Sequence, residues 1–227
     1  MKKYVSILAV LLIAAALSVS LGGCASTPKA ADGSFTIDFT KAKGSSLENT
    51  KQSDGSMFWI DNSWADFDRS LFKGVAPSVR WIYSECPVPD RNKWWQGFGA
   101  NDVKWNLAGF THVTITYMAS RGGDSITFTM SEAHQAQARE ASTVIIPEVA
   151  NEWVELKLAL ADFTTPEGMN YLNKQFAPPT WSNITGWLFG AGTVPVKEEA
   201  FFWVDSIVFT NEGTAQSVSE VEEVVEE

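Results

Sequence analysis

Positive charge is scarce in this sequence. Its 227 residues include 17 Lys and Arg against 27 Asp and Glu, which gives a formal net charge of −10. Removal of an N-terminal segment that contains Lys2 and Lys3, argued below, changes this charge to (17 − 2) − 27 = −12. Nucleic acids and anionic lipids are bound by basic surfaces, so we expect neither as a partner of this acidic chain.

The sequence also lacks the motifs of common catalytic sites. Its two histidines, His112 and His134, have no serine or cysteine nucleophile motif around them. No Gly-rich phosphate-binding loop is present. A glycosidase needs two carboxylates at a defined separation, and the sequence distinguishes no such pair. We interpret Glu132, His134 and Glu140 as residues of a surface loop, not as metal ligands, and we expect no enzyme.

Cysteine is nearly absent, and one of the two cysteines has a special setting. Cys24 follows a short basic segment, an apolar run over residues 5–17 and the sequence Leu21-Gly22-Gly23. This pattern resembles a bacterial lipobox, and the run is too short to span a membrane. We expect lipidation of Cys24 and an outer-membrane destination; an ordinary secretory signal cut after Ala25 is the alternative. Cys86 would then be the remaining thiol, which excludes an intrachain disulfide.

Composition divides the chain into four parts. We expect a lipoprotein signal peptide at 1–23, a lipidated tether at 24–33, one folded domain at 34–211 and an acidic tail at 212–227. The tail contains neither a basic nor an aromatic residue. Such a composition favours solvated chain over packed structure.

Alternation of apolar and polar residues predicts many short strands and almost no amphipathic helix. We interpret 61–68 as an acidic, aromatic loop, 84–105 as a long connection, 131–141 as a helical turn or loop, and 169–174 as a helical turn. Eight to ten short strands favour an all-β fold, a two-sheet β-sandwich. The strands are expected at 35–39, 56–60, 78–83, 111–118, 125–130, 142–146, 152–160, 183–190 and 200–210.

The strand expected at Ala200–Thr210 has apolar residues on both faces, as in the middle of a packed β structure. Simple alternation places Phe201, Trp203, Asp205 and Ile207 on the same face. Asp205 then needs hydrogen-bond donors, a cation or a metal, because an unpaired buried carboxylate is costly. Four tryptophans in alternating strands are predicted to fill the core: Trp81, Trp153, Trp187 and Trp203.

Three motifs in this order carry a resemblance to a known family. They are WVELKL at 153–158 with LADF at 160–163, ITGWLF at 184–189 and FWVDSI at 202–207, preceded by WNLAGF at 105–110. Over residues 35–209 the chain resembles the galactose-binding-like jelly roll of bacterial carbohydrate-binding modules, nearest to family eleven and its relatives. The resemblance implies a jelly-roll sandwich that binds carbohydrate without catalysis.

The same resemblance implies a structural calcium ion. In this superfamily the Asp of the closing strand often ligates calcium with an acidic residue near the first strand, and Asp205 and Asp38 stand at these places. A Glu is more usual at the second place. Calcium accepts carboxylate and carbonyl oxygens. Alternatively, Asp205 accepts hydrogen bonds from backbone or Ser groups. The sequence leaves calcium binding and hydrogen bonding both open.

Ten tryptophans are more than a sandwich of this size needs for its core. Sugar rings pack on aromatic planes, and their hydroxyls pair with Asp, Asn, Gln and Arg. We expect stacking on either Trp94 or Trp95, since consecutive strand residues face opposite ways; both could instead cap the core. We interpret the Asp66–Ser70 turn as solvated, because it lacks the Gly and Glu of a calcium loop. The predicted carbohydrate-binding residues are Trp94, Trp95, Arg91, Gln96, Asn101, Trp64 and Trp181.

The sequence therefore predicts a lipid-anchored protein of the bacterial cell envelope that binds a poly- or oligosaccharide through exposed aromatic side chains. A structural or assembly lipoprotein that binds another envelope protein is the alternative, and a broad apolar patch would indicate it. A β-sandwich glycan hydrolase is a third possibility.

Overall fold

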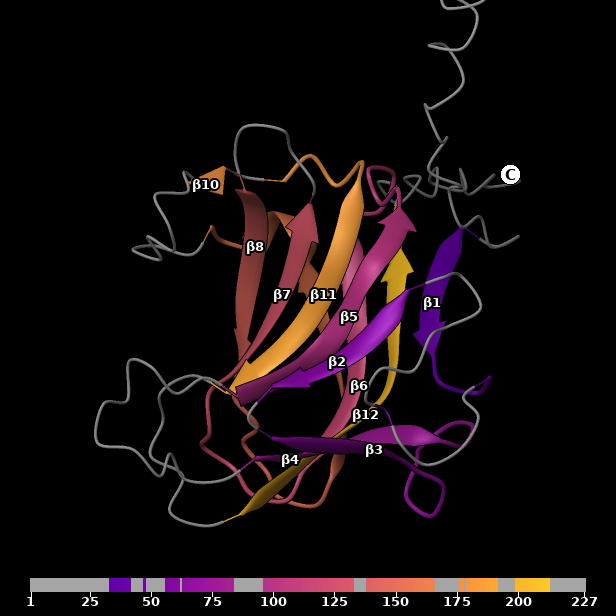
Figure 1. The fold of residues 1–227 in the computed structure, drawn as a ribbon, viewed down its shortest axis with the longest axis vertical. Coiled ribbons are helices and arrows are strands. Elements are labelled where there is room, and N and C mark those ends of the chain that lie inside the picture. The colour runs from indigo at the N-terminus through magenta and orange to yellow at the C-terminus, as the bar shows by residue number, and fades with distance from the viewer. Residues whose placement is uncertain are drawn as a thin grey trace, which may run out of the picture.

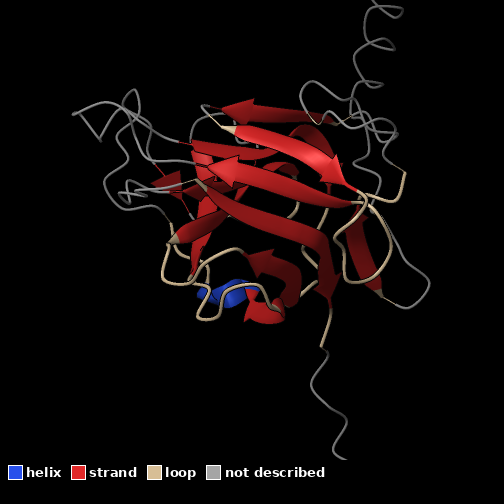
Figure 2. Ribbon diagram, turned by 90° about the horizontal axis from the view of Figure 1, so that it is seen from below, coloured by secondary structure: helices blue, strands red, loops and turns tan. Residues whose placement is uncertain are grey.

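Within the described residues the protein is built almost entirely of strands. The computed structural model describes residues 33–41, 47, 56–61, 63–83, 96–132, 138–165, 176–177, 179–191 and 199–212. Figure 2 shows strands throughout this part of the chain, with one short helical turn, η2, at Leu160–Asp162. The strands are β1 (Ser34–Asp38), β2 (Met57–Asp61), β3 (Trp64–Asp68), β4 (Ser78–Tyr83), β5 (Gln96–Trp105), β6 (His112–Ala119), β7 (Ile126–Glu132), β8 (Ala138–Ile145), β9 (Trp153–Ala159), β10 (Phe176–Ala177), β11 (Ile184–Ala191) and β12 (Ala200–Thr210).

The strands form two sheets that pack face to face (Figure 1). The first sheet has the order β3-β4-β12-β6-β9, and β1 pairs with the later half of β12. The second sheet has the order β10-β8-β7-β11-β5-β2. The pairing of β10 with β8 is parallel and the other pairings are antiparallel. The predicted all-β, two-sheet sandwich is confirmed.

Aromatic side chains from the two sheets meet in the core. Trp81 of the first sheet lies 5.5 Å from Phe98 of the second, and Phe202 lies 5.7 Å from Phe189, between ring centroids. These four side chains and Trp187 are buried. Burial of such large apolar surfaces is the main force that holds the two sheets together. The core positions predicted for Trp81 and Trp187 are confirmed.

The other two tryptophans lie on the outer face of the first sheet. Trp203 is buried, as predicted, but its neighbours Phe202 and Val204 are the residues that face the core. Strand register places Trp203 opposite Met118, and Met118 opposite Trp153. Trp153 is half-buried, so the prediction that it fills the core is wrong.

Strand β12 coincides with the predicted closing strand, but its alternation is broken by a β-bulge. The register between β12 and β6 shifts between Val204 and Ser206. Phe202 and Val204 before the bulge and Ile207 after it are all buried. Asp205 is the extra residue, and a bulge of this kind re-aims the side chains that follow it. The predicted single face through Trp203, Asp205 and Ile207 is therefore wrong.

Two strands lie where the sequence predicted loops. Residues 61–68 contain β3, in which Ala65 and Phe67 face the core between polar neighbours. Residues 84–105 contain β5, whose Gly and Asn residues have low strand propensity. Pairing with β11 on one side and β2 on the other stabilises β5 nonetheless.

The loop or helical turn expected at 131–141 is wrong where the chain is described, since β7 continues to Glu132 and β8 begins at Ala138. The helical turn expected at 169–174 lies outside the described residues. The division of the chain into 34–211 and its flanks stays a prediction. The described segments contain no helix with the length and apolar character needed to cross a membrane.

Candidate functional site

An apolar row crosses three strands on the outer face of the first sheet. Trp64 of β3 lies opposite Ile82 of β4, and Ile82 lies opposite Phe201 of β12. These residues alternate with buried ones along each strand, which places all three on the solvent side. The Trp64 side chain is 57% exposed, and the other two are half-buried. We call these three residues the Trp64 row.

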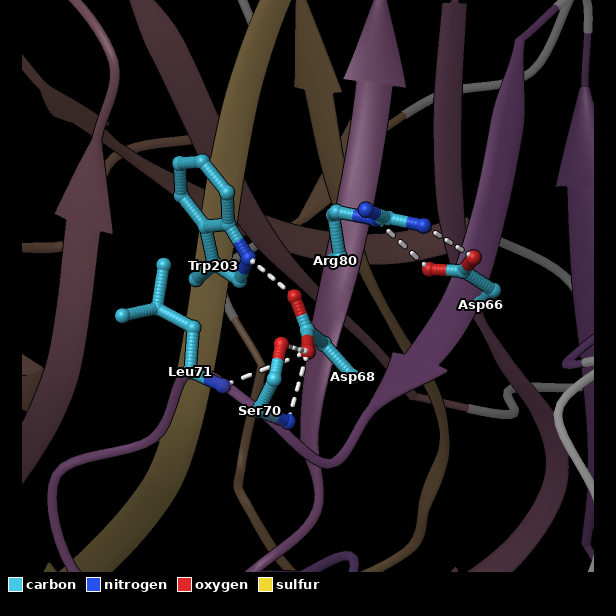
Figure 3. A network of polar contacts seen from close by, with 6 residues as sticks. All are labelled: Asp66, Asp68, Ser70, Leu71, Arg80 and Trp203. Carbon is cyan, nitrogen blue, oxygen red and sulfur yellow. Dashed lines mark hydrogen bonds and ion pairs between the residues drawn. The ribbon is translucent and has the colours of Figure 1, made fainter.

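An ion pair lies in the next row of the same face. Asp66 lies opposite Arg80, and Arg80 lies opposite Trp203. The Arg80 guanidinium donates from Nε to Asp66 Oδ1 at 2.9 Å and from Nη2 to Asp66 Oδ2 at 2.5 Å (Figure 3). Hydrogen bonding to Asp66 raises the pKa of Arg80, against the opposing effect of burial. A two-point pair of this kind holds both side chains in one geometry.

Asp68 fixes the indole of Trp203 and the start of the following loop (Figure 3). Its Oδ2 accepts a hydrogen bond from Trp203 Nε1 at 3.1 Å. Its Oδ1 accepts from the amide and hydroxyl of Ser70, at 2.9 and 2.7 Å, and from the Leu71 amide at 3.2 Å. Burial raises the pKa of Asp68, but these four hydrogen bonds outweigh it, and the pKa is lowered. Arg69 and Ser70 are exposed, as expected for a solvated turn, and Asp68 in addition holds Trp203.

The loop at 69–77, which we call the flap, is tied to β12 and β9 of the first sheet. Asp205 Oδ1 accepts hydrogen bonds from the amides of Lys73 at 2.8 Å and Gly74 at 3.2 Å. Lys73 also pairs with Glu155 of β9, with 2.9 Å between Nζ and Oε1. Asp68 at one end and Asp205 at the middle therefore fix the flap beside Trp203.

The carboxylate of Asp205 lies beside backbone hydrogen-bond donors. Its Oδ1 faces two amide N–H groups, and Gly74 N also lies 3.3 Å from Oδ2. Calcium takes six to eight oxygen ligands, and nowhere among the described residues do three His, Cys, Asp or Glu side chains gather. Asp38 is described through its backbone, which lies opposite Ser206. The hydrogen-bonding alternative for Asp205 is observed, and calcium binding by Asp205 with Asp38 stays a prediction.

Glu132 is a buried carboxylate at the end of β7 that holds the segment before β11. It accepts hydrogen bonds from the Thr180 amide and hydroxyl, at 2.7 and 2.5 Å, and from the amides of Ser182 and Asn183, at 3.1 and 3.3 Å. Burial raises its pKa, but the hydrogen bonds outweigh this effect and lower it. The interpretation of Glu132 as a surface-loop residue is wrong, because its side chain is buried among these donors.

The lowered pKa values of Asp68 and Glu132 predict an acid-sensitive fold. A carboxylate with a lower pKa in the folded state contributes stability that is complete above its unfolded pKa and is lost as pH falls through its folded pKa. The ordinary values are 3.8 for Asp68 and 4.5 for Glu132. We expect the urea concentration at the unfolding midpoint to decrease as the pH is lowered from about 5 to about 3. The difference in urea midpoint between wild type and Asp68→Asn should become smaller as the pH is lowered over this range. If the two plots of midpoint against pH run parallel, the stabilising role of the Asp68 carboxylate is contradicted.

Several solved structures similar to this chain are carbohydrate-binding modules. The family 11 module of a cellulosomal cellulase of Clostridium thermocellum gives a TM-score of 0.52 at 11% identity, covering 80% of this chain and 96% of that one. A family 11 module from the same organism, in complex with a β-1,3-1,4-mixed-linked tetrasaccharide, gives 0.50 at 12% identity, covering 80% and 98%. The chain has the jelly-roll fold of these modules. No family model matches the sequence, and no curated protein matches it.

The jelly roll brings two of the predicted binding segments close together. Ser63, which precedes Trp64, donates from Oγ to the Gly97 carbonyl at 3.3 Å. Gly97 follows Gln96, the first residue of β5. Gln96 itself is buried, and residues 91–95 precede it directly in the sequence. The predicted residues Arg91, Trp94, Trp95 and Cys24 lie outside the described part of the chain.

The jelly roll places two other predicted residues apart from the Trp64 row. Asn101 is exposed on β5, opposite Met57 and Gly186 in the second sheet. Trp181 is half-buried, and its ring packs edge-on against Phe163, with 5.8 Å between centroids. Its backbone has a φ of 63°, the left-handed region that bulky residues rarely adopt. The flanking hydrogen bonds to Glu132 hold this conformation.

Three residues in and beside the Trp64 row were not predicted as site residues from the sequence: Arg80, Ile82 and Phe201. The predicted strand at 78–83 already placed Arg80 and Ile82 on one face by alternation. The sequence gives no sign that this face lies between β3 and β12, because register depends on pairing between distant segments.

Proposed function

We propose that this protein binds carbohydrate without catalysing a reaction on it, through the Trp64 row and the neighbouring Asp66–Arg80 pair. The observation that carries the proposal is the 57% exposed indole of Trp64, aligned with Ile82 and Phe201 beside a charged pair. An apolar strip packs against the C–H faces of sugar rings. Guanidinium and carboxylate groups beside it can pair with hydroxyls.

The similar solved structures support this proposal. One of these modules was solved with a β-1,3-1,4-mixed-linked tetrasaccharide. In the chain itself the carboxylates of Asp66, Asp68, Glu132 and Asp205 all accept hydrogen bonds from protein groups. Each of these four acids therefore has a structural role in the domain.

The proposal includes a lipid anchor at Cys24 that holds the domain in the cell envelope, at the outer membrane. The lipobox-like sequence before Cys24 supports this part. Metabolic labelling with a palmitate analogue tests it: the full chain should carry the label, and Cys24→Ala should not.

The proposed site is tested by substitution of Trp64. We expect Trp64→Ala to weaken binding to a retained polysaccharide at least tenfold, about 1.4 kcal/mol. Because the side chain is mostly exposed, stability should change by no more than about 0.5 kcal/mol. Affinity gels loaded with neutral β-glucans and galactans would measure retention of the full chain in mild detergent.

The matched control is Met57→Ala, since Met57 is 39% exposed on an outer strand of the second sheet. Its retention should equal that of wild type. Equal retention of folded Trp64→Ala and wild type would contradict the proposed site, and no retention on any polysaccharide would contradict the function.

A second candidate function is binding of another envelope protein. Val144, Ile146 and Val149 are 55%, 55% and 47% exposed and lie within six residues of sequence. Aliphatic side chains suit a protein surface better than a sugar. Co-purification of an envelope protein with the full chain that is lost in Ile146→Lys and kept in Trp64→Ala would favour this second function.

A further inference from the structure

Arg80 lies in the row next to the Trp64 row, and two carboxylates act on it. Asp66 binds the guanidinium at two points, and both Asp66 and Asp68 stabilise its positive charge. One guanidinium against two carboxylates gives this group of three side chains a net negative charge. The side chains of Arg80 and Asp66 are 34% and 17% exposed, so a ligand on the Trp64 row would lie against a partly sheltered pair.

An Arg80 side chain without a carboxylate partner would give this surface a different specificity. A guanidinium binds a carboxylate through two parallel hydrogen bonds, a geometry that lysine cannot reproduce. Asp66 already occupies the Nε–Nη2 edge of Arg80 and neutralises its charge. A sugar carboxylate at the remaining Nη1–Nη2 edge would meet an already neutralised guanidinium, the carboxylates of Asp66 and Asp68, and the acidic surface of the whole chain. Like charges placed together at an interface cost several kcal/mol.

Uncharged sugars meet no such penalty. A guanidinium has five N–H donors, and the pair with Asp66 uses two of them. Hydroxyl groups both donate and accept hydrogen bonds, so they can pair with a neutralised guanidinium–carboxylate couple without breaking it.

We propose that Asp66 is a specificity-determining residue, which restricts the Trp64 row to uncharged sugar chains by occupying the guanidinium of Arg80. The inference rests on the proposed function and adds the charge class of the ligand. It predicts that removal of the Asp66 carboxylate admits chains that carry carboxylates.

The test compares two forms of one polymer on the full chain: β-1,3-1,4-glucan, and the same glucan oxidised to carboxylates at C6. Wild type should bind the neutral form at least tenfold more tightly. Asp66→Asn should bind the oxidised form at least tenfold more tightly than wild type does, so that the ratio of the two affinities shifts toward the oxidised form. Asp66→Asn with Arg80→Gln should lose this gain, because the gain requires the guanidinium.

Salt dependence gives a second readout, and its wild-type measurement needs no variant. Salt screens repulsion and attraction alike. Added NaCl should therefore strengthen the binding of oxidised glucan to wild type and weaken its binding to Asp66→Asn.

A folded Asp66→Asn that still discriminates as wild type does would overturn the inference, as would equal binding of both polymers by wild type. Either result leaves the proposed function standing if Trp64→Ala weakens binding. No binding of either polymer, or of any polysaccharide tested above, by wild type would instead overturn the proposed function itself.

Discussion

Gly99→Ala should unfold or severely destabilise the domain, by about 3 kcal/mol or more, the upper end for overpacked sites. Gly99 lies in β5 between Leu188 of β11 and Trp59 of β2. A Cβ at this position would lie 2.1 Å from the Trp187 carbonyl oxygen and 2.8 Å from Leu188 Cα. Both atoms are backbone, so no rotamer change relieves the clash, and β5 would have to separate from β11.

Urea unfolding followed by tryptophan fluorescence measures this effect. The matched control is Gly109→Ala, because a Cβ at Gly109 has no atom within 4 Å. Where the backbone accepts it, Gly→Ala is neutral or stabilises a protein by about 0.4–1 kcal/mol. If the urea midpoint of Gly99→Ala is as close to that of wild type as the midpoint of Gly109→Ala is, β5 and β11 do not approach each other as closely as described.

Glu132→Ala should also destabilise the domain strongly, by about 3–5 kcal/mol, the usual cost of breaking a buried charged network. The substitution leaves the amides of Thr180, Ser182 and Asn183 without the carboxylate that accepts from them. The segment that holds Trp181 in its left-handed conformation would also lose its support. Glu132→Gln keeps one acceptor oxygen and should lose less.

Glu152→Ala is the comparison for this series, because Glu152 is an exposed acid before β9. It should unfold within about 0.5 kcal/mol of wild type, as surface substitutions usually do. Limited proteolysis would show whether Glu132→Ala opens the 179–183 segment first. Equal midpoints for Glu132→Ala and Glu152→Ala would mean that the buried carboxylate contributes nothing net to stability.

Much of the sandwich follows from alternation in single strands. The strands at 78–83 and 200–210 were predicted at their observed bounds, since their β-branched and aromatic residues suit a packed sheet. β5 escaped prediction because a strand rich in Gly and Asn depends on its neighbours for stability. The bulge at Asp205 escaped too, because one extra residue leaves no mark on composition and yet reverses every face beyond it.

The candidate site could be predicted only in part. An exposed Trp64 was among the predicted residues, because a tryptophan between acids is easily recognised as a surface aromatic. Its alignment with Ile82 and Phe201 needs the pairing of three strands separated by long stretches of chain. The pairing of Asp66 with Arg80 across β3 and β4 likewise depends on register, which local sequence does not encode.

The pairing of β1 with β12 decides how the domain is displayed. Ser34 lies opposite Thr210, so the chain enters and leaves the sandwich side by side. Phe201 precedes Thr210 by 210 − 201 = 9 residues on the same strand, which at about 3.3 Å per residue places them about 30 Å apart. The Trp64 row thus lies at the end of the first sheet that is far from Ser34 and Thr210. A lipid at Cys24 would attach the chain to the membrane on the side of Ser34, with the Trp64 row at the far end of the domain. A large polymer could then reach the row without approaching the lipid surface.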